Sequence, residues 1–206
     1  MSGRIKEACA EMLPAETERH RFDVEEYHRM AEAGILSEDD RVELIDGEIV
    51  EMTPIGARHV NCVNRLTLLL VEFSARRYEV SVQNPLRLDD EREFEPDLVL
   101  LRERPGETVF SVPAVEDALL VVEVAETSLE RDRNVKLPRY ARAGVPEVWI
   151  VDLGAERVEL YARAGATGSY EIARTYGRGE TVRSETVPGL VLDVVEVLGG
   201  FAAGER

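Results

Sequence analysis

Apolar residues recur every three or four positions in three segments of the chain, and this period predicts helices. The longest of these segments spans residues 57–77. A shorter helix is expected after Asp23, which can cap its first turn while Glu26 returns the capping bond. A third helix is expected within residues 132–143, because Gly144 offers a suitable C-terminal stop.

Short apolar runs between turn residues predict the strands. In the segment RVELIDGEIVEM, Asp46 and Gly47 separate two such runs as a two-residue hairpin turn would, and this turn pairs Glu43 with Val50. A strand, a helix and a strand follow one another over residues 118–152, so we expect a parallel crossover there. The strands predicted after the hairpin span residues 78–82, 86–88, 98–101, 118–124 and 147–152, with further strand-like segments behind them.

These elements predict one α/β domain over residues 22–206. Residues 1–21 mix acids and bases and lack an apolar signal-peptide core, so we expect them to form a mobile N-terminal arm. No apolar run approaches the roughly 18 to 20 residues of a membrane span. With only two cysteines, Cys9 and Cys62, the chain has no disulfide framework, and we expect it to be cytoplasmic and to have no membrane partner.

The charge of the chain argues against a generally basic surface. The 206 residues include 25 Lys or Arg and 41 Asp or Glu, a formal net charge of −16. Nucleic-acid binding should therefore be weak and sensitive to salt. One local basic stretch could contact phosphates or could be a solvated helix face; it consists of Arg131, Arg133, Lys136, Arg139 and Arg142.

Most of the acidic residues are explained as parts of a solvated surface, but two of them have a different sequence context. Asp97 follows Pro96 at the mouth of an apolar strand, and Glu123 lies inside the apolar run ALLVVEVAE. A carboxylate in such a place is costly to desolvate without a partner. A turn aspartate and an ion-paired sheet residue are the structural interpretations. Together, two acids at the ends of neighbouring strands can hold a hard divalent cation.

Lys136 could supply the cationic side chain that phosphate chemistry needs beside such a pair. Pro138 disfavours a regular helix around it, so we expect the helix to begin near Asn134 or later, with Lys136 in or before its first turn. The alternative is a surface lysine paired with Asp132, four residues earlier.

Two of four other residues have both a structural and a functional interpretation. His59 either packs on the long helix or acts as an auxiliary base, and Gln83 is either at a strand edge or contacts phosphate. Packing is the simpler role for Tyr140 and for Trp149, which lies in an apolar strand. Three histidines and two cysteines offer no zinc spacing, and the phosphate-loop, dinucleotide, zinc-protease and nucleophile-elbow motifs are missing.

The ordered set of Glu43 in RVELIDGEIV, Pro96-Asp97, Glu123 in VVEVAE and the segment ERDRNVKLPRYARAGVPEVWIVD resembles a large bacterial family of restriction-endonuclease-like proteins, the Uma-two family. That family is assigned to the PD-(D/E)XK nuclease superfamily. The resemblance covers about residues 22–161. It implies a restriction-endonuclease-like mixed β-sheet flanked by helices, with the N-terminal helix and hairpin attached. It also implies a metal-dependent endonuclease that hydrolyses phosphodiester bonds of nucleic acid, with DNA as the first expectation.

By the same resemblance, Asp97 and Glu123 are the metal-binding catalytic acids and Lys136 is the superfamily's catalytic lysine. Glu43 matches an acid in the family's early hairpin and is either a third metal or water ligand or a surface acid. A strict E-x-K motif would place the lysine at position 125, where this chain has Ala125. Lys136 can act only if the next helix brings its ammonium back to the strand ends. Oxygen ligands favour Mg²⁺ or Mn²⁺ as the metal.

A second interpretation keeps the fold without the activity. The chain would then be a non-catalytic module that binds a partner or forms a homodimer. The acidic charge, the alanine at the motif position and the small number of aromatic residues, 12 in all, favour this interpretation.

Overall fold

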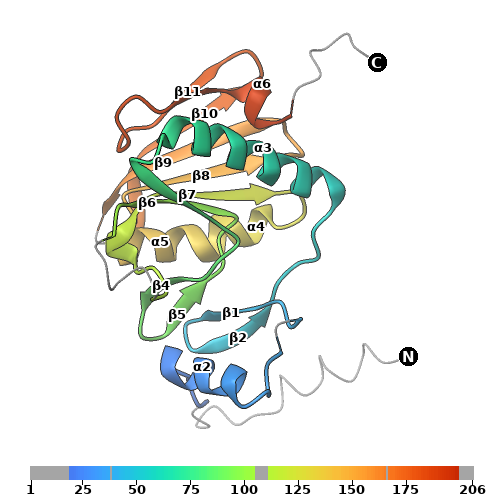
Figure 1. Cartoon of the computed structure of the whole chain (residues 1–206), viewed down its shortest axis with the longest axis vertical. Helices are drawn as coiled ribbons and strands as arrows, with labels where there is room; N and C mark the ends of the chain where they lie inside the picture. The colour runs from blue at the N-terminus through green and yellow to red at the C-terminus, as the bar shows by residue number, and fades with distance from the viewer. Residues whose placement is uncertain (1–18, 38, 105–110, 166, 200–206) are drawn as a thin grey trace.

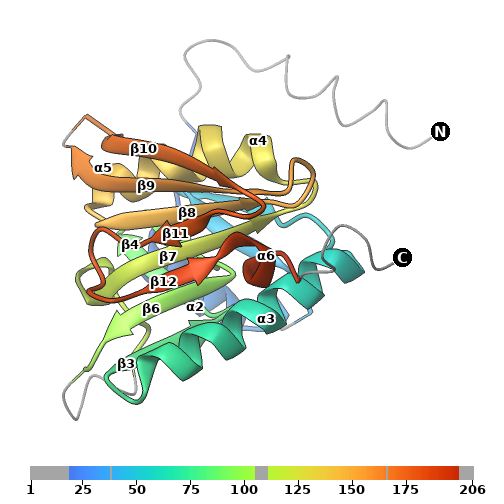
Figure 2. The same ribbon diagram turned by 90° about the horizontal axis from the view of Figure 1, so that it is seen from above.

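In the computed structural model, which describes residues 19–37, 39–104, 111–165 and 167–199, a six-stranded mixed sheet carries helices on both faces (Figures 1 and 2). Its strand order is β10-β9-β8-β7-β6-β3. Strands β7 and β8 pair in parallel, which confirms the predicted crossover, and the other neighbours pair antiparallel. The strands are β3 (Tyr78–Val82), β6 (Leu98–Arg102), β7 (Ala118–Ala125), β8 (Glu147–Asp152), β9 (Arg157–Gly165) and β10 (Ser169–Gly177).

A second, four-stranded antiparallel sheet has the order β2-β1-β5-β4. The predicted hairpin is confirmed: Asp46 and Gly47 both have positive φ, as the tight turn requires, and Glu43 pairs with Val50. Strand β5 was not predicted, because its sequence, Arg-Glu-Phe, has too few apolar residues to reveal a strand that pairs on both sides. The strands are β1 (Val42–Ile45), β2 (Glu48–Glu51), β4 (Leu86–Asp89) and β5 (Arg92–Phe94).

The predicted helices are present, and they divide between the two faces of the large sheet. Helix α3 (Ala57–Ser74) covers one face, whereas α4 (Leu129–Arg131) and α5 (Leu137–Ala143) lie on the other (Figure 2). Helix α2 (Val24–Glu32) begins with the predicted capping box of Asp23 and Glu26 and lies against the small sheet (Figure 1). No helix in the described part of the chain is long and apolar enough to span a membrane. The remaining elements are the 3₁₀ turn η2 (Val115–Asp117), β11 (Thr181–Arg183), β12 (Val191–Asp193) and α6 (Val194–Val197).

The regular helix α5 begins at Leu137 with Lys136 directly before its first turn, as predicted, but further helical turns precede it. The backbone is helical from Leu129, and a π-helical turn, η3 (Asp132–Lys136), joins α4 to α5. In this turn Leu137 N donates to the carbonyl of Asp132, five residues earlier instead of four. Pro138 therefore enters at the first turn of α5, where a proline is tolerated. The π turn is the reason why the proline does not delay the helix.

The first part of the predicted N-terminal arm, residues 1–18, lies outside the described residues. The end of that arm contacts the hairpin. Arg21 Nη1 donates to the carbonyl of Asp46 at 2.7 Å and lies 2.9 Å from Glu48 Oε1, and Phe22 N donates to the carbonyl of Gly47 at 2.9 Å.

Side chains alternate between the two faces of the large sheet and make two apolar cores. Leu98, Leu100 and Val122 pack in the core under α3, whereas Val99 and Val121 pack in the core under α5. Glu123 falls on the same face as Val121, because it lies two residues later in the strand. The alternation that builds the cores thus directs this carboxylate toward the α5 side.

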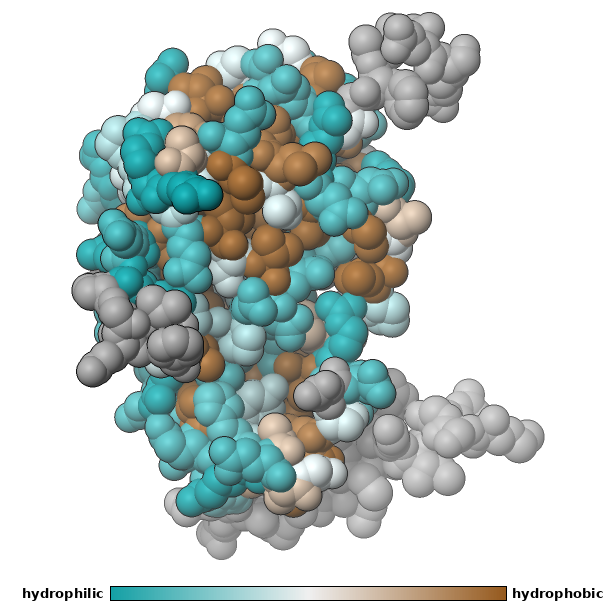
Figure 3. Space-filling model, viewed as in Figure 1, coloured by the Kyte–Doolittle hydropathy of each residue, from teal (hydrophilic) through white to brown (hydrophobic). Residues whose placement is uncertain are grey.

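We predict that Leu100→Ala lowers the free energy of unfolding by about 2 to 5 kcal/mol, because this fully buried side chain would leave a cavity. Leu68→Ala is the matched control. Leu68 is 71% exposed on α3, where apolar surface gathers on the outside of the molecule (Figure 3), and its removal should change stability by less than about 0.5 kcal/mol. Urea denaturation of the two variants measures both values, and equal losses would contradict the assignment of the core.

Candidate functional site

The sheet register brings the two candidate acids together. Asp97 immediately precedes β6, and Glu123 lies near the end of its antiparallel neighbour β7. Because Leu98 pairs with Val122, Asp97 and Glu123 face each other one residue beyond that pair. The backbone N–H of Val124 donates to Asp97 Oδ2 at 2.8 Å and fixes the carboxylate at the strand ends.

Two side chains approach the other oxygen of Asp97. Gln83 Nε2 donates to Asp97 Oδ1 at 3.2 Å, and His59 Nε2 lies 2.9 Å from the same oxygen. His59 comes from the first turn of α3, and its Nδ1 donates to the carbonyl of Val124 at 2.9 Å. His59 and Gln83, each of which had two interpretations, therefore both contact Asp97.

Lys136 lies between two buried carboxylates. Its Nζ is 2.8 Å from Glu123 Oε1 and 2.8 Å from Glu43 Oε1, and all three side chains are at least 94% buried. The predicted alternative, an ion pair with Asp132, does not form; Asp132 instead accepts a hydrogen bond from Ser128 Oγ at 2.6 Å. The helix that follows β7 does bring the ammonium back to the strand ends.

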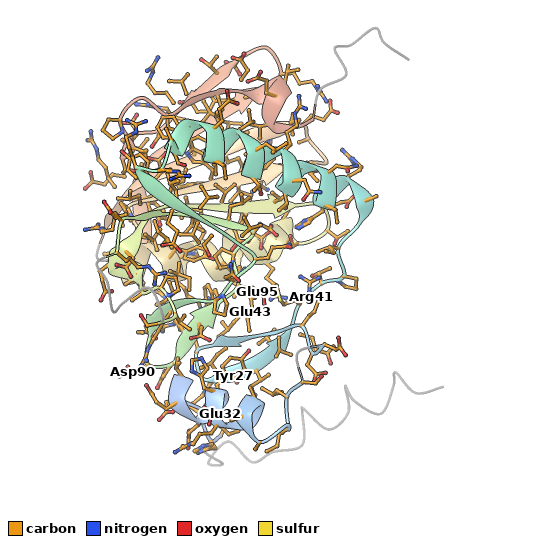
Figure 4. All side chains as sticks on the ribbon, in the orientation of Figure 1. Tyr27, Glu32, Arg41, Glu43, Asp90 and Glu95 are labelled. Atoms are coloured by element: carbon orange, nitrogen blue, oxygen red, sulfur yellow. The ribbon has the colours of Figure 1, made fainter. Side chains whose placement is uncertain are left out.

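Glu43 reaches the site from the small sheet. Both of its oxygens have partners: the N–H of Glu95 donates to Oε1 at 2.9 Å, and Arg131 Nη2 donates to Oε2. Figure 4 shows Glu43, Glu95 and Arg41 close together where the small sheet meets the large one. The surface-acid interpretation of Glu43 is wrong, because the residue is 1% exposed.

Tyr140 does more than pack. Its ring meets Phe94 edge-on with centroids 5.3 Å apart, and its hydroxyl donates to Glu123 Oε1 at 2.6 Å. Trp149 is a core residue, as predicted, and its indole N–H donates to the buried Glu147. Glu123 is thus held by an ammonium and a phenol on one oxygen.

A pocket opens over these groups, and acids dominate its lining. They include Asp132 and Glu95, which the sequence analysis did not select as site residues. Asp132 is 5% exposed, and this burial raises its pKa, with Asp97 and Glu43 adding to the effect. The full lining is Arg41, Glu43, Met52, Thr53, Pro54, Ile55, Gly56, His59, Glu95, Asp97, Glu123, Val124, Glu126, Thr127, Ser128, Arg131, Asp132 and Lys136.

Burial and mutual repulsion shape the protonation of the central groups. Burial raises the pKa of Glu123 to about 8 against the attraction of Lys136, and the charges of Asp132, Asp97 and Glu43 add to the rise. Burial opposes the charge of Lys136, yet the neighbouring carboxylates raise its pKa, so the ammonium stays protonated. Lys136 and Arg131 together lower the pKa of Glu43 although burial opposes this.

The donor chemistry of the pocket fits a hard divalent cation, since carboxylate oxygens line it from several elements. Among the described residues, no three His, Cys, Asp or Glu side chains already stand together in positions that would hold a metal ion. Lys136 occupies the space between two of the acids. Asp97 and the second oxygen of Glu123 are the groups that could bind a metal without displacing that ammonium.

Four of the five residues in the local basic stretch are engaged by acids, whereas the fifth, Arg142, is exposed. Arg133 pairs with Glu159, and Arg139 pairs with Asp46. Arg131 and Lys136 are engaged by Glu43, as described above. For these four residues the contacts favour a structural role.

The raised pKa of Glu123 generates a prediction about stability and pH. From pH about 4.5, the ordinary value, to about 8, the folded protein keeps a proton that the unfolded chain has lost. The contribution of Glu123 to stability therefore falls as pH rises through this window. Glu123→Gln removes the titration, so its stability relative to wild type should increase from pH 5 to pH 8 and then level off.

Urea unfolding at a series of pH values, without divalent cations, measures this difference. Glu171→Gln is the control, because Glu171 is exposed on β10 and should follow the wild type. A difference between Glu123→Gln and wild type that stays constant from pH 5 to pH 8 would contradict the raised pKa.

Known proteins resemble this chain in sequence and in fold. A solved structure, "Crystal structure of a putative nuclease belonging to DUF820 from Anabaena variabilis ATCC 29413", aligns with a TM-score of 0.67 at 12% identity, over 86% of this chain and 98% of that one. This similarity confirms the restriction-endonuclease-like fold, and at such an identity it carries the fold alone.

Sequence comparison identifies the family. An uncharacterised protein (sll1609) of Synechocystis sp. (strain ATCC 27184 / PCC 6803 / Kazusa) is 34% identical over 136 residues, which cover 61% of this chain and 74% of that protein. The model of the family Uma2, described as "Putative restriction endonuclease", matches residues 24–195. This chain therefore belongs to the Uma2 family of restriction-endonuclease-like proteins.

Proposed function

We propose that the chain is a metal-dependent nuclease that hydrolyses phosphodiester bonds of nucleic acid, DNA in the first instance. The observation that carries this proposal is the pair of Asp97 and Glu123 on adjacent strands, with the buried ammonium of Lys136 against one of them. Family and fold agree with it. The roles of individual residues follow from the contacts in this chain.

Asp97 and Glu123 would hold the cation, Mg²⁺ or Mn²⁺, through carboxylate oxygens. The bound cation would supply Lewis acidity for the phosphate and a more acidic water as nucleophile. Asp97 is suited to this role because Val124 N–H fixes the direction of its carboxylate. Tyr140 and Lys136 both bind Oε1 of Glu123, and this leaves Oε2 for the metal.

Lys136 would present a fixed positive charge at the wall of the pocket, where negative charge develops on the phosphate. Two carboxylates restrict its ammonium, so the charge needs no reorganisation during the reaction. The role of Glu43 as a third metal or water ligand stays a prediction. Because both of its oxygens are engaged, Glu43 fits better as the residue that positions Lys136 and Arg131.

Arg41 is the best candidate to meet the phosphate backbone at the pocket. It lines the pocket, and its side-chain contact among the described residues is with Met52 Sδ at 4.0 Å instead of with a carboxylate. An arginine in this state can bind a phosphate without first leaving an acidic partner. The overall charge of −16 opposes nucleic-acid binding elsewhere on the surface, so binding should depend on this local cation and on the metal.

The first prediction from this proposal concerns the metal. Asp97→Asn should weaken Mn²⁺ binding at least tenfold, because an amide oxygen carries no charge to offset that of the cation. Asp117→Asn is the matched control, since Asp117 lies in η2 outside the pocket and should leave the affinity unchanged. Isothermal titration calorimetry measures both. A wild-type chain that binds no Mn²⁺ would instead support the non-catalytic module.

The second prediction concerns Lys136. Lys136→Ala should abolish most Mn²⁺-dependent cleavage of DNA, whereas Arg139→Ala, on the same helix but paired with Asp46, should retain it. Lys136→Ala should also destabilise the metal-free protein by about 3 to 5 kcal/mol, because it leaves Glu43 and Glu123 buried without their cation.

Thermal unfolding on the same preparations keeps the two effects apart. Cleavage is compared at a temperature where both variants are folded. Lys136→Arg should rescue stability in part and cleavage poorly, because a planar guanidinium does not replace a compact ammonium. A folded Lys136→Ala variant that cleaves DNA at the wild-type rate would contradict the role assigned to this lysine.

A further inference from the structure

We propose that His59 is a nitrogen ligand of the divalent cation, and that it makes the site favour transition ions such as Mn²⁺ over Mg²⁺. This inference rests on the proposed function, since it concerns the same cation. It adds a ligand from α3 to the two carboxylates of the large sheet.

One ring nitrogen has a settled role. Nδ1 lies 2.9 Å from the carbonyl oxygen of Val124, and a carbonyl can only accept, so Nδ1 carries a hydrogen. In the neutral ring, Nε2 then carries the lone pair. Histidines that bind metals usually donate their other N–H to a carbonyl or carboxylate in this way, which fixes both tautomer and ring orientation.

The other nitrogen is buried and lacks a hydrogen bond. The side chain of His59 is 9% exposed, and Nε2 has no hydrogen-bond partner among the described residues. Asp97 Oδ1 is only 2.9 Å away, but the ring does not direct Nε2 at that oxygen with hydrogen-bond alignment. A buried lone pair this close to a carboxylate oxygen is costly; a proton on Nε2 would form an ion pair with Asp97, and a cation bound to both atoms would remove the same cost.

The spacing of the two atoms matches a shared metal. Two donors at right angles in an octahedral site, each with a bond of about 2.1 Å, lie about 3.0 Å apart. They point at the metal and not at each other. The contact between His59 Nε2 and Asp97 Oδ1 has this length and this lack of mutual alignment.

A nitrogen ligand would change which metal the site prefers. Mg²⁺ favours oxygen ligands and water, whereas imidazole suits first-row transition ions. We therefore expect His59→Gln to lower the affinity for Mn²⁺ at least tenfold and the affinity for Mg²⁺ much less. The ratio of the two affinities, measured by calorimetry, should fall toward that of a site made of oxygen ligands only.

Pulsed electron paramagnetic resonance of bound Mn²⁺ tests the ligand directly, because a coordinated imidazole nitrogen couples to the metal. The full chain is prepared with ¹⁵N-histidine and with ordinary histidine. In the wild type, labelling should replace the ¹⁴N coupling of bound Mn²⁺ by a ¹⁵N coupling. In His59→Gln no histidine coupling should remain. The chain contains only three histidines, so the double variant His20→Gln/His28→Gln, which keeps His59, should retain the coupling even if His59 variants fold poorly.

The outcomes separate this inference from the proposed function. Mn²⁺ that binds with an affinity dependent on Asp97, but without histidine coupling, would overturn the role of His59 and leave the carboxylate site intact. Loss of coupling in the double variant would overturn it as well. If the wild-type protein binds no Mn²⁺, both the inference and the proposed function fail.

Discussion

The buried ammonium of Lys136 is the interaction on which the arrangement of the site depends. It connects Glu43, from the small sheet, to Glu123, from the large one, through two contacts of 2.8 Å. Removing one partner from a buried pair leaves an uncompensated charge, so each of the three side chains constrains the other two. Lys136 is also the single lysine among the described residues, where every other strong base is arginine. The position suits a compact ammonium that two carboxylates can approach from opposite sides.

The position of Lys136 on a helix instead of at position 125 has a simple geometric explanation. In an E-x-K strand, the acid and the lysine lie on the same face because side chains alternate. Here Ala125 fills the lysine position and packs in the core under α5 on that same face, two residues after Glu123. The π turn then delivers Lys136 from the helix that covers this face, and Pro138 is accommodated directly after it. The ammonium reaches the same side of the sheet from a different element.

Some parts of the site could be predicted from the sequence. In these parts the residues are close together in the chain, or strand pairing brings them together. The Asp-Gly turn fixed the register of the hairpin and with it the position of Glu43. Two apolar strands with acids at adjoining ends were sufficient to expect Asp97 beside Glu123.

Contacts between segments that are far apart in the chain could not be predicted from local patterns and strand pairing. Strand β5 is too polar to be recognised alone and forms because β1 and β4 pair with it. The helical residues before α5 include a π turn, which has no sequence signal. Asp132 was considered only as a partner of Lys136, four residues away, whereas in the structure it is buried in the pocket lining with residues from distant segments. The partnerless nitrogen of His59 likewise follows from where α3 meets the end of β7.

The excess of acidic residues in this protein bears on the order in which the metal and the nucleic acid bind at the proposed site. A pocket lined by six acidic residues disfavours a phosphodiester, and burial raises the pKa of Glu123 and Asp132 because it disfavours their charged forms. A divalent cation would stabilise those charges and convert the same surface into one that attracts phosphate. The net charge of −16, which argues against a nuclease that binds DNA through a basic surface, is compatible with one whose substrate affinity comes from the metal. On this view the metal binds before the nucleic acid, and the acidic pocket excludes phosphate until it does.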